Sequence, residues 1–366
     1  MRYLILANNS GGLYRFRKEI ITELVNQGNA VYVSTPFDTF VDELRALGIT
    51  VIEQVMNRRG TNPLQEANVF FSYRTLIKQL KPDYIITYTI KPGIYGGMWA
   101  RHYRIPYAVN ITGLGTAFQK KGVLLDFIVR LWKCALKKAN VVFFENQGNA
   151  NVFLEYNIIS TNQVKTLNGA GVNMVDFPFA DYPKETDETR LLFVGRVMHE
   201  KGVDELLAAV EHLHDAGYKI HLDVVGPYEE NYETRLQQLE KRGLLTFYGY
   251  QKDVRPYIIQ AHVFVLPSYH EGMANTLLEC AAMGRPLITT RIHGCMEAVV
   301  ENETGFLCEV ANVDSLVAQL ERFLNLPYEK RKEMGKHAHE HIARNYDKQN
   351  IVQETLATLT EFCTAR

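Results

Sequence analysis

The chain has 366 residues, enough for two or three domains of ordinary size. Its composition is 46% hydrophobic and 11% aromatic, so it can bury large cores, which excludes global disorder. With 40 basic and 41 acidic residues the net charge is −1, and this balance gives no indication of a nucleic-acid partner.

The cysteines favour a reducing, cytoplasmic setting. They are odd in number and form no C-x-x-C pair, so neither a disulfide framework nor a zinc site is indicated. The opening MRYLILANNSGG has an apolar run of about six residues, too short for a signal peptide, and is expected to form a buried strand. No window approaches the roughly 18 apolar residues of a membrane-spanning helix.

In the first part of the chain, short β-branched or aromatic runs alternate with amphipathic stretches. The expected strands are Tyr3 to Ala7, Ala30 to Ser34, Ile49 to Glu53, Tyr84 to Tyr88, Tyr107 to Ile111 and Val141 to Glu145. The expected helices are Tyr14 to Gln27, Phe40 to Leu47, Leu64 to Leu80 and Leu124 to Lys138. Strands that alternate with helices at this spacing predict a parallel sheet with right-handed crossovers.

After a connector at residues 168–190 the alternation of strands and helices begins again. Strands are expected at LLFVGR, IHLDVVG, LTFYGY, VFVLPS, PLITT and GFLCEV, and two helices without a following strand end the chain. We therefore predict an α/β fold of two doubly wound, Rossmann-like domains at residues 1–170 and 184–345, with the C-terminal helix at 348–366 completing the first. Two such domains are expected to face a central cleft, with ligands outside the carboxyl ends of the strands.

The segment LLFVGRVMHEKGVDELLAAV contains the first group of candidate binding residues. A buried strand ends at Gly195, Arg196 and Lys201 follow on a loop, and Gly202 leads into a helix. The glycines permit close backbone approach, and the cations lie at the carboxyl end of a strand, where they can form charge-assisted hydrogen bonds to a phosphate. We predict a phosphate site without a Walker motif; a pair of solvated loop cations is the equally weighted alternative.

The segment HEGMANTLLEC places two carboxylates in an otherwise apolar stretch. A helix is expected from about Ala274 to Met283, so Gly272 to Asn275 lie at its N-terminus, where free amides and the helix dipole favour anions. Glu271 precedes the helix, and capping is the plain alternative for it. Glu279 lies within the helix, and carboxylates are seldom buried without a partner.

The spacing of Glu271 and Glu279 argues against an acid and base pair. If both were helical, they would lie about 80° apart around the axis and about 12 Å apart along it. A glycosidase acid and nucleophile require about 5 to 9.5 Å. We interpret the two glutamates as hydrogen-bond acceptors at opposite ends of one extended ligand, and hydroxyl-rich sugars suit such acceptors.

Other loops after expected strands offer weaker candidates. The first strand is followed by Gly11 and Gly12, in a loop that resembles a nucleotide-binding turn but lacks G-x-G-x-x-G, so a flexible loop beside the cleft and a plain turn both remain open. Three more loops could meet a second substrate, and their candidate residues are Arg59, Lys91, Thr112 and Gly113. No Asp-x-Asp or H-E-x-x-H sequence occurs, so no metal is predicted, and the loop cations would neutralise a leaving diphosphate themselves.

Two of these motifs resemble those of a known enzyme family. The G-R-x-x-x-x-K-G loop from Gly195 to Gly202 and the E-x7-E element from Glu271 to Glu279 are similar to those of retaining glycosyltransferases of family 4, which have the GT-B fold. The connector LNGAGVNMVDF and the GCMEAVVENETGF stretch follow the order of the same family. The similarity extends over nearly the whole chain and is strongest in the second domain.

The resemblance implies a role for each matching residue. Arg196 and Lys201 would hold the donor diphosphate, Glu271 the hydroxyls of the transferred sugar, and Glu279 the donor ribose, so that the catalytic set is Glu271, Arg196 and Lys201. Further donor contacts are implied for Gly195, Gly272, Met273, Ala274, Asn275, Thr276, Gly11 and Gly12. The loop at residues 250–254 would seat the base.

The resemblance also implies the reaction. Family members are thought to retain the anomeric configuration by front-face displacement, in which the leaving phosphate helps to deprotonate the acceptor hydroxyl. The first-domain loops look like those of bacterial members that build capsule or O-antigen surface polysaccharides. The implied function is metal-independent transfer of a hexose or N-acetylhexosamine from a UDP-sugar, a donor substrate and not a cofactor, to a saccharide linked to polyprenyl diphosphate. A GT-B-like nucleotide-sugar epimerase and a non-catalytic nucleotide-sugar-binding protein are the alternatives.

The sequence departs from the family at the end of the fourth strand, and it also contains a basic amphipathic helix. Many members have a histidine near the end of the fourth strand, where this chain has Thr89, Ile90 and Lys91, so no histidine role is carried over. The segment Leu124 to Lys138 combines an apolar stripe with lysines, and such a helix can lie on an anionic membrane surface. Packing on its own sheet is the alternative; with membrane contact, the enzyme would be peripheral at the inner face of the cytoplasmic membrane.

Overall fold

The computed structural model describes residues 1–57, 60, 62–118 and 121–363. The chain divides into two compact units, each described by itself below. Unit 1 comprises Met1–Ala170 with Gln349–Arg366, and unit 2 comprises Gly171–Lys348. The last helix, α13 (Lys348–Cys363), therefore belongs to unit 1 from Gln349 onward.

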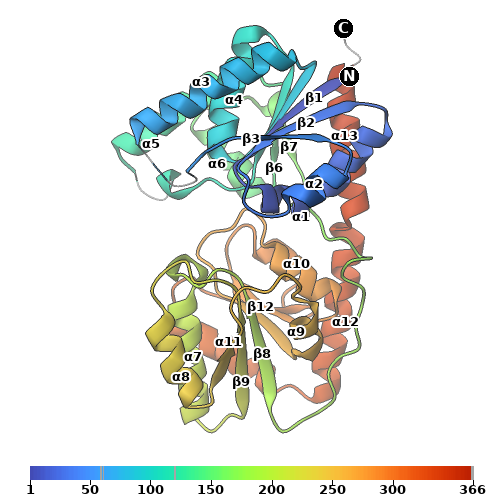
Figure 1. Ribbon diagram of the computed structural model, residues 1–366. Helices are drawn as coiled ribbons and strands as arrows, with labels where there is room; N and C mark the ends of the chain where they lie inside the picture. The colour runs from blue at the N-terminus through green and yellow to red at the C-terminus, as the bar shows by residue number, and fades with distance from the viewer. Residues whose placement is uncertain (58–59, 61, 119–120, 364–366) are drawn as a thin grey trace. The chain divides into compact units, whose positions relative to one another are not determined.

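Unit 1 is built on a parallel sheet with the strand order β3-β2-β1-β4-β5-β6-β7 (Figure 1). The strands are β1 (Arg2–Leu6), β2 (Ala30–Thr35), β3 (Thr50–Glu53), β4 (Tyr84–Tyr88), β5 (Tyr107–Ile111), β6 (Val141–Phe144) and β7 (Val164–Thr166). The strands β4, β5 and β6 are buried throughout, which explains their mainly apolar sequences.

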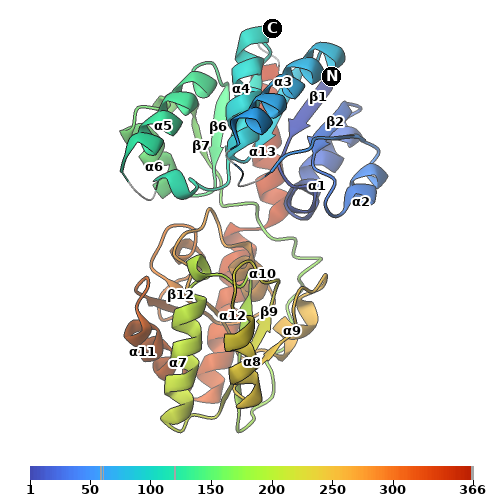
Figure 2. The same cartoon turned by 60° about the vertical axis from the view of Figure 1, so that its left-hand side comes forward.

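Two layers of helices cover this sheet (Figures 1 and 2). Helices α1 (Ser10–Asn26), α2 (Val41–Ala46) and α13 pack on one face. Helices α3 (Pro63–Leu80), α4 (Ile90–Tyr103), α5 (Val123–Leu136) and α6 (Gln147–Glu155) pack on the other. Short 3-10 turns at Thr116–Phe118 and Thr161–Gln163 complete the connections.

Unit 2 repeats the architecture with a parallel sheet in the order β10-β9-β8-β11-β12-β13. The strands are β8 (Thr189–Val194), β9 (Ile220–Val225), β10 (Leu245–Phe247), β11 (Val263–Leu266), β12 (Leu287–Thr290) and β13 (Gly305–Cys308). The helices are α7 (Val203–Asp215), α8 (Glu233–Lys241), α9 (Arg255–Gln260), α10 (Asn275–Ala282), α11 (Val313–Leu324) and α12 (Tyr328–Asn345), with 3-10 turns at His199–Lys201 and Met296–Ala298. Helices α7 and α11 pack together on one face of the sheet, and α10 and α12 on the other (Figure 1).

The prediction of two doubly wound parallel sheets is confirmed, and the topology locates one edge where a ligand is expected. In unit 2 the chain order reverses between β8 and β11, which are neighbours in the sheet. Open α/β sheets bind ligands at the carboxyl ends of strands beside such a switch point. The loops that follow β8 and β11 are therefore the places to look for a site. Among the described residues no helix combines the length and the apolar character needed to cross a bilayer.

A buried ion pair joins α1 to the carboxyl edge of the unit 1 sheet. Arg17 donates to Glu145, just past β6, at 2.6 Å, and the two side chains are only 7% and 10% exposed. The Arg17 guanidinium also lies 5.1 Å from the centre of the Tyr88 ring. Burial raises the pKa of the Tyr88 hydroxyl, and the Arg17 charge opposes this shift while Glu145 adds to it. The pair thus balances charge within the core.

We expect Glu145→Ala to lower the free energy of unfolding of unit 1 by about 3 to 5 kcal/mol, because Arg17 would remain as an unpaired buried charge. Both tryptophans, Trp99 and Trp132, lie in unit 1, so their fluorescence during a urea titration follows this unit. Asp42→Ala is the matched control. Asp42 pairs with Arg45 at 2.8 Å but is 90% exposed, and its loss should cost no more than about 1 kcal/mol. Equal losses in the two variants would contradict the prediction.

Candidate active site

The loop after β8 contains the predicted phosphate-binding cations and is shaped by Gly202. Lys201 ends a 3-10 turn, and Gly202 adopts a left-handed backbone, φ +69°, as it enters α7. A Cβ at Gly202 would collide with the backbone carbonyl oxygen of Pro267, the residue that follows β11. Glycine is therefore required both by the turn and by the contact, and the two loops beside the switch point touch through their backbones.

Lys201 and Glu271 form an ion pair between these two loops. Their side chains are 17% and 13% exposed, so the pair is largely shielded from water. The same carboxylate oxygen, Oε1 of Glu271, accepts a hydrogen bond from Ser268 Oγ at 2.9 Å. Glu271 is thus held by a buried hydroxyl on its own loop and by a cation on the neighbouring one.

Arg196 also faces a carboxylate. Its Nη1 lies 3.3 Å from Oε1 of Glu229, and the side chains are 37% and 30% exposed. The backbone amides of Glu229 and Glu230 both donate to the carbonyl of Val197, and the amide of His199 donates to Glu230 Oε2 at 2.7 Å. The loop that follows β9 therefore lies along the loop after β8 and supplies its acidic neighbours.

Tyr269 links the two loops a second time. Its hydroxyl donates to Glu205 Oε1 at 2.6 Å, and its amide donates to the carbonyl of Glu200 at 2.9 Å. Burial, followed by this hydrogen bond to Glu205, raises the pKa of Tyr269, so the hydroxyl keeps its proton. The ring of His199 packs edge-on against Tyr269, and its hydrogen bond with Asp204 raises the pKa of His199. These contacts fix the position of Glu271 relative to Lys201.

The N-terminus of α10 lies directly after this pair, as the sequence predicted, but two details differ. Glu271 does not cap the helix; the cap position is Ala274, which offers no side-chain cap, and Glu271 bonds Lys201 and Ser268 instead. The amide of Ala274 is not open to a ligand either, because it donates to the carbonyl of Gly294 at 2.8 Å. Gly272 and Met273 are buried in the same turn, and the first helical residues are Asn275 and Thr276.

The separation estimated for the two glutamates does not apply, because only Glu279 is helical. Glu271 lies four residues before α10 begins, whereas Glu279 is within it and half-buried. The loop at residues 250–254, expected to seat a base, follows β10, and Tyr250 is 51% exposed there. The side chain of Asn275 adds a buried oxygen, Oδ1, with no hydrogen-bond partner among the described residues.

In unit 1 the structure corrects the interpretation of the glycine loop. Gly11 and Gly12 lie in the first turn of α1 and not in a flexible loop. The amides of Ser10 and Gly11 donate to Asp38 Oδ1 at 3.0 and 3.2 Å, and the amide of Gly12 donates to Asn9. The donors expected to meet a diphosphate are therefore already bonded to side chains of the same unit.

The acceptor-side candidates of unit 1 have different surroundings. Lys91 lies in the first turn of α4, and its ammonium donates to the carbonyls of Asn57 and Gly60, each at 2.7 Å, and to Glu66. All three of its protons are thus engaged within the unit, so Lys91 does not present an open cation. Thr112 and Gly113 follow β5 and are partly exposed. Arg59 lies outside the described residues.

Three supporting residues were not singled out from the sequence. Ser268 contacts Glu271, Glu229 contacts Arg196, and Gly294, with φ +89°, packs against the backbone of Glu271 and Gly272. The S-x-x-E spacing from Ser268 to Glu271 was a usable signal, whereas nothing in the local sequence pairs Glu229 with Arg196. Within the described part of the chain, no group of three or more His, Cys, Asp or Glu side chains is arranged to hold a metal ion.

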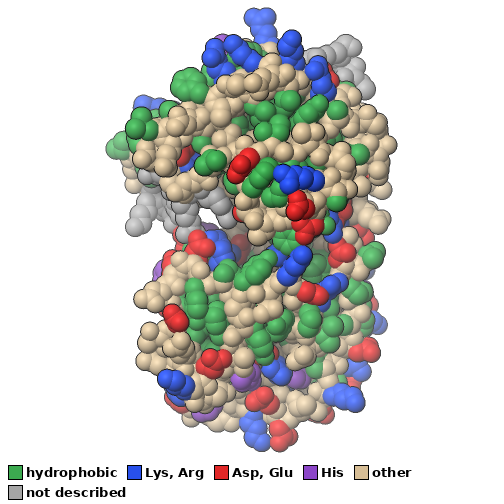
Figure 3. Space-filling view, in the orientation of Figure 1, with side chains coloured by type: hydrophobic (Ala, Val, Ile, Leu, Met, Phe, Trp, Pro, Cys, Tyr) green, Lys and Arg blue, Asp and Glu red, His purple; other side chains and the backbone are tan. Residues whose placement is uncertain are grey.

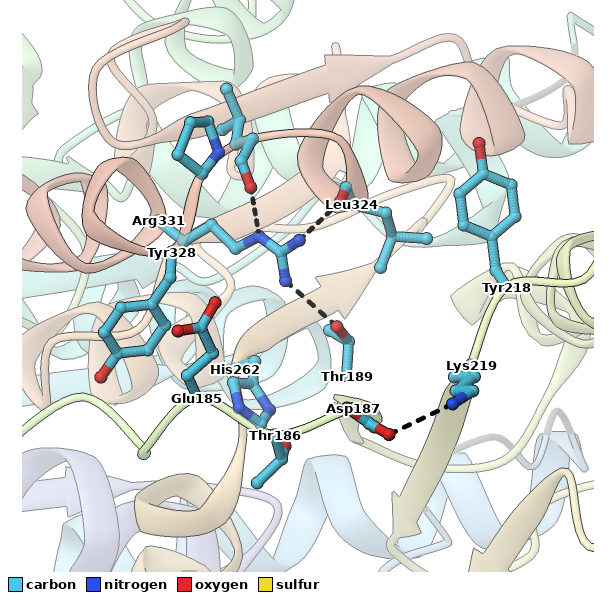
Figure 4. Close-up of a pocket in the computed structure, with 12 residues that line it drawn as sticks. Glu185, Thr186, Asp187, Thr189, Tyr218, Lys219, His262, Leu324, Tyr328 and Arg331 are labelled. Carbon is cyan, nitrogen blue, oxygen red and sulfur yellow. Dashed lines mark hydrogen bonds and ion pairs between the residues drawn. The ribbon is translucent and has the colours of Figure 1, made fainter.

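A pocket of about 280 Å³ lies at the opposite edge of the unit 2 sheet, where β8, β9 and β11 begin (Figure 4). Its cation Arg331 donates to Leu326 O at 3.0 Å, Thr189 Oγ1 at 3.1 Å and Leu324 O, so each guanidinium nitrogen has an acceptor. Lys219 pairs with Asp187. These groups tie the end of α11 to the sheet, and the pocket is separate from the loops described above.

Comparisons with known proteins identify the family of the chain. The family model for glycosyl transferases group 1 matches residues 175–341, and that for glycosyl transferase 4-like domains matches residues 4–146. The chain therefore belongs to this family of GT-B glycosyltransferases, and the resemblance seen in its sequence is confirmed.

Its relatives include bacterial glycosyltransferases. The chain is 28% identical over 342 residues to the N,N'-diacetylbacillosaminyl-diphospho-undecaprenol alpha-1,3-N-acetylgalactosaminyltransferase of Campylobacter jejuni, a match that covers 88% of the chain and 89% of the relative. It is 25% identical over 309 residues to the capsular polysaccharide biosynthesis glycosyltransferase CapM of Staphylococcus aureus, covering 78% and 80%.

Solved structures share the fold at lower identity. Sucrose-phosphate synthase of Thermosynechococcus elongatus superimposes with a TM-score of 0.82 at 19% identity and full coverage of both chains. Anabaena HepE in complex with UDP-glucose gives a TM-score of 0.78 at 18% identity, covering 98% of this chain and 99% of HepE. These similarities support the GT-B fold.

We expect Gly202→Ala to destabilise unit 2 and to displace the loop after β8, because a methyl group there meets the Pro267 carbonyl. Gly217→Ala is the matched control: Gly217 also has a positive φ, +91°, but open space around it. Both variants carry backbone strain of about 1 kcal/mol, and only Gly202→Ala adds the collision. Thermal unfolding of the two variants measures the difference, and equal shifts in Tm would contradict it.

Proposed function

We propose that the chain is a retaining glycosyltransferase that moves a hexose or N-acetylhexosamine from a UDP-sugar to a lipid-linked saccharide during surface polysaccharide assembly. The observation that carries the proposal is the ion pair of Lys201 with Glu271 at the switch point of the unit 2 sheet, with Arg196 on the same loop as Lys201. Two cations and an acceptor, set beside a helix N-terminus, suit a diphosphate joined to a sugar.

When the donor binds, the two cations of the site would leave their carboxylate partners and pair with the donor diphosphate. Lys201 is paired with Glu271, so a diphosphate that takes the ammonium leaves the carboxylate to accept hydrogen bonds from sugar hydroxyls. Arg196 would turn from Glu229 to the same diphosphate. Glu279 would accept from the ribose, and the first amides of α10 would face the phosphate. The UDP-glucose complex of the structurally similar HepE supports a UDP-sugar as donor.

The chemistry we propose needs positioning and charge stabilisation from the protein. Arg196 and Lys201 would neutralise the charge that develops on the departing UDP, in the role that a metal ion has in other transferases. The leaving phosphate would help to deprotonate the acceptor hydroxyl on the same face of the sugar, which retains the anomeric configuration. Glu271 would orient the sugar ring for this attack.

For the acceptor, we propose a saccharide on a polyprenyl diphosphate carrier. The relative from Campylobacter jejuni is named for such an acceptor, and its match extends over most of both chains. Thr112 and Gly113, at the carboxyl end of β5, remain the acceptor-side candidates with exposed surface. The enzyme would work at the cytoplasmic face of the membrane in which its acceptor is embedded.

The proposal is tested by transfer assays with a panel of UDP-sugars, a polyprenyl diphosphate saccharide and EDTA. Transfer with the α-linkage of the donor preserved, undiminished by EDTA, is the expected result. The same donors without acceptor should remain unchanged apart from slow hydrolysis. Interconversion of UDP-sugars in that control would identify an epimerase, and tight donor binding without turnover on any acceptor would identify a binding protein.

We expect Lys201→Ala and Glu279→Ala to lower kcat/KM by about 100-fold or more, since each removes a charged contact to the donor. Lys219→Ala is the matched control, because Lys219 belongs to the same unit but pairs with Asp187 at the opposite sheet edge. Steady-state kinetics give the ratio, and Tm values near that of the wild type show that the variants are folded. Full activity in both site variants would disprove the assignment.

Glu229→Gln is expected to tighten UDP binding about three- to ten-fold. Glu229 occupies Arg196 and adds a negative charge beside the phosphate position, so its neutral analogue competes less. Glu233→Gln, on the exposed first turn of α8, should leave binding unchanged. Calorimetric titration of UDP measures both. Weaker binding by Glu229→Gln would show that the carboxylate positions Arg196 instead of competing for it.

A further inference from the structure

Most of the apolar stripe predicted on the helix at Leu124 to Lys138 faces the core of unit 1. Its residues Leu125, Trp132 and Ala135 are buried between the helices and the sheet, together with Val129 and Leu136 of the same helix, α5. Ile128 and Leu131 are partly buried against the same core. The alternative interpretation, a helix packed on its own sheet, holds for this face.

The outward face of α5 has an unusual composition. Its first turns expose three apolar side chains: Val123 is 86% exposed, Leu124 64% and Phe127 56%. A soluble surface rarely gathers large apolar groups on successive positions of one helix end. Figure 3 shows hydrophobic side chains exposed on the side of unit 1 where Figure 1 places α5.

The same face is basic around and beyond these apolar residues. The exposed charged residues from 121 to 138 are Lys121, Asp126, Arg130, Lys133, Lys137 and Lys138. Five cations against one acid give this short segment a local charge of +4, in a chain whose net charge is −1. Positive charge is thus concentrated next to the exposed apolar group, which is the combination that anionic lipid surfaces attract.

We propose that the start of α5 is the membrane contact of this enzyme, with Val123, Leu124 and Phe127 inserting among the acyl chains of an anionic bilayer and the flanking lysines and Arg130 contacting lipid phosphates. This inference rests on the proposed function in one respect: a lipid-linked acceptor gives the enzyme a reason to be at the bilayer. The occupant it commits to is the bilayer itself, because charge and apolar exposure occur together on one face.

The test is flotation of the full-length protein with vesicles of phosphatidylcholine containing about 30% phosphatidylglycerol. Binding should be strong at low salt and weaken several-fold when salt is raised or phosphatidylglycerol is left out. The double variant Leu124→Gln/Phe127→Gln should bind at least about ten-fold more weakly. Lys133→Gln/Lys137→Gln should lose affinity about five-fold or more on anionic vesicles only.

Controls separate this contact from nonspecific adsorption to vesicles and from self-association. Val175→Ser removes a side chain that is 79% exposed in unit 2 and should not change vesicle binding. Unchanged binding of the α5 variants, or an equal loss in Val175→Ser, would overturn the proposal. So would a wild-type dimer that dissociates in Leu124→Gln/Phe127→Gln, since a second copy would then cover the patch.

Activity distinguishes the patch from the proposed function. The α5 variants should keep wild-type turnover on a short-chain, water-soluble acceptor and lose it only on an acceptor embedded in vesicles. Loss on both acceptors would overturn the membrane role. If the wild type binds anionic vesicles through α5 but transfers no sugar to any acceptor, the membrane contact stands and the proposed reaction fails.

Discussion

The contact between Gly202 and the carbonyl of Pro267 is the constraint on which the candidate site depends. It joins the loop after β8 to the loop after β11 at backbone distance, and a side chain at residue 202 would force them apart. The ion pair of Lys201 with Glu271, one residue before Gly202 and four after Pro267, follows from that proximity. The bonds of Tyr269 to Glu200 and Glu205 hold the same two loops together farther along. The order of strands in the sheet places the two loops side by side, and these contacts fix the position of one loop relative to the other.

Both cations of the candidate site are already paired with carboxylates, and this has a consequence for affinity. Arg196 faces Glu229 and Lys201 faces Glu271, so each cation that would bind a diphosphate already has an acidic partner. Binding then depends on the difference between two sets of ion pairs and not on the full attraction of two bare cations. The two pairs differ in exposure. The side chains of Arg196 and Glu229 are about one third exposed, so breaking their ion pair costs little, whereas the more shielded Lys201 and Glu271 would have to separate before Glu271 could accept from a sugar.

Most strands could be predicted because burial on both faces of a parallel sheet leaves mainly apolar runs, as in β4 and β5, whose bounds agree with those expected. β7 was missed because its three residues, Val164 to Thr166, lie half-exposed at the sheet edge and carry no such run. The site was predictable where glycine and charge patterns are local, at Gly195 to Gly202. Contacts between distant segments could not be predicted. The pairing of Glu229 with Arg196 and the hydrogen bonds of Asp38 to the first turn of α1 depend on tertiary packing.

The same reasoning separates the two basic features of unit 1 that looked alike in the sequence. Lys91 has three internal acceptors, the carbonyls of Asn57 and Gly60 and the carboxylate of Glu66, so its charge is neutralised within unit 1. The cations of α5 instead stand on a helix face whose inner side is already buried, next to apolar side chains that the core does not cover. A lysine that has satisfied its donors inside the fold contributes little to recognition, whereas one exposed beside uncovered apolar surface leaves both its charge and that surface available to a partner. Because the chain as a whole is almost neutral, no general attraction would bring it to an anionic bilayer. The local cluster of cations on α5 would attract the protein to such a bilayer, and it would also determine which face of unit 1 meets the lipid.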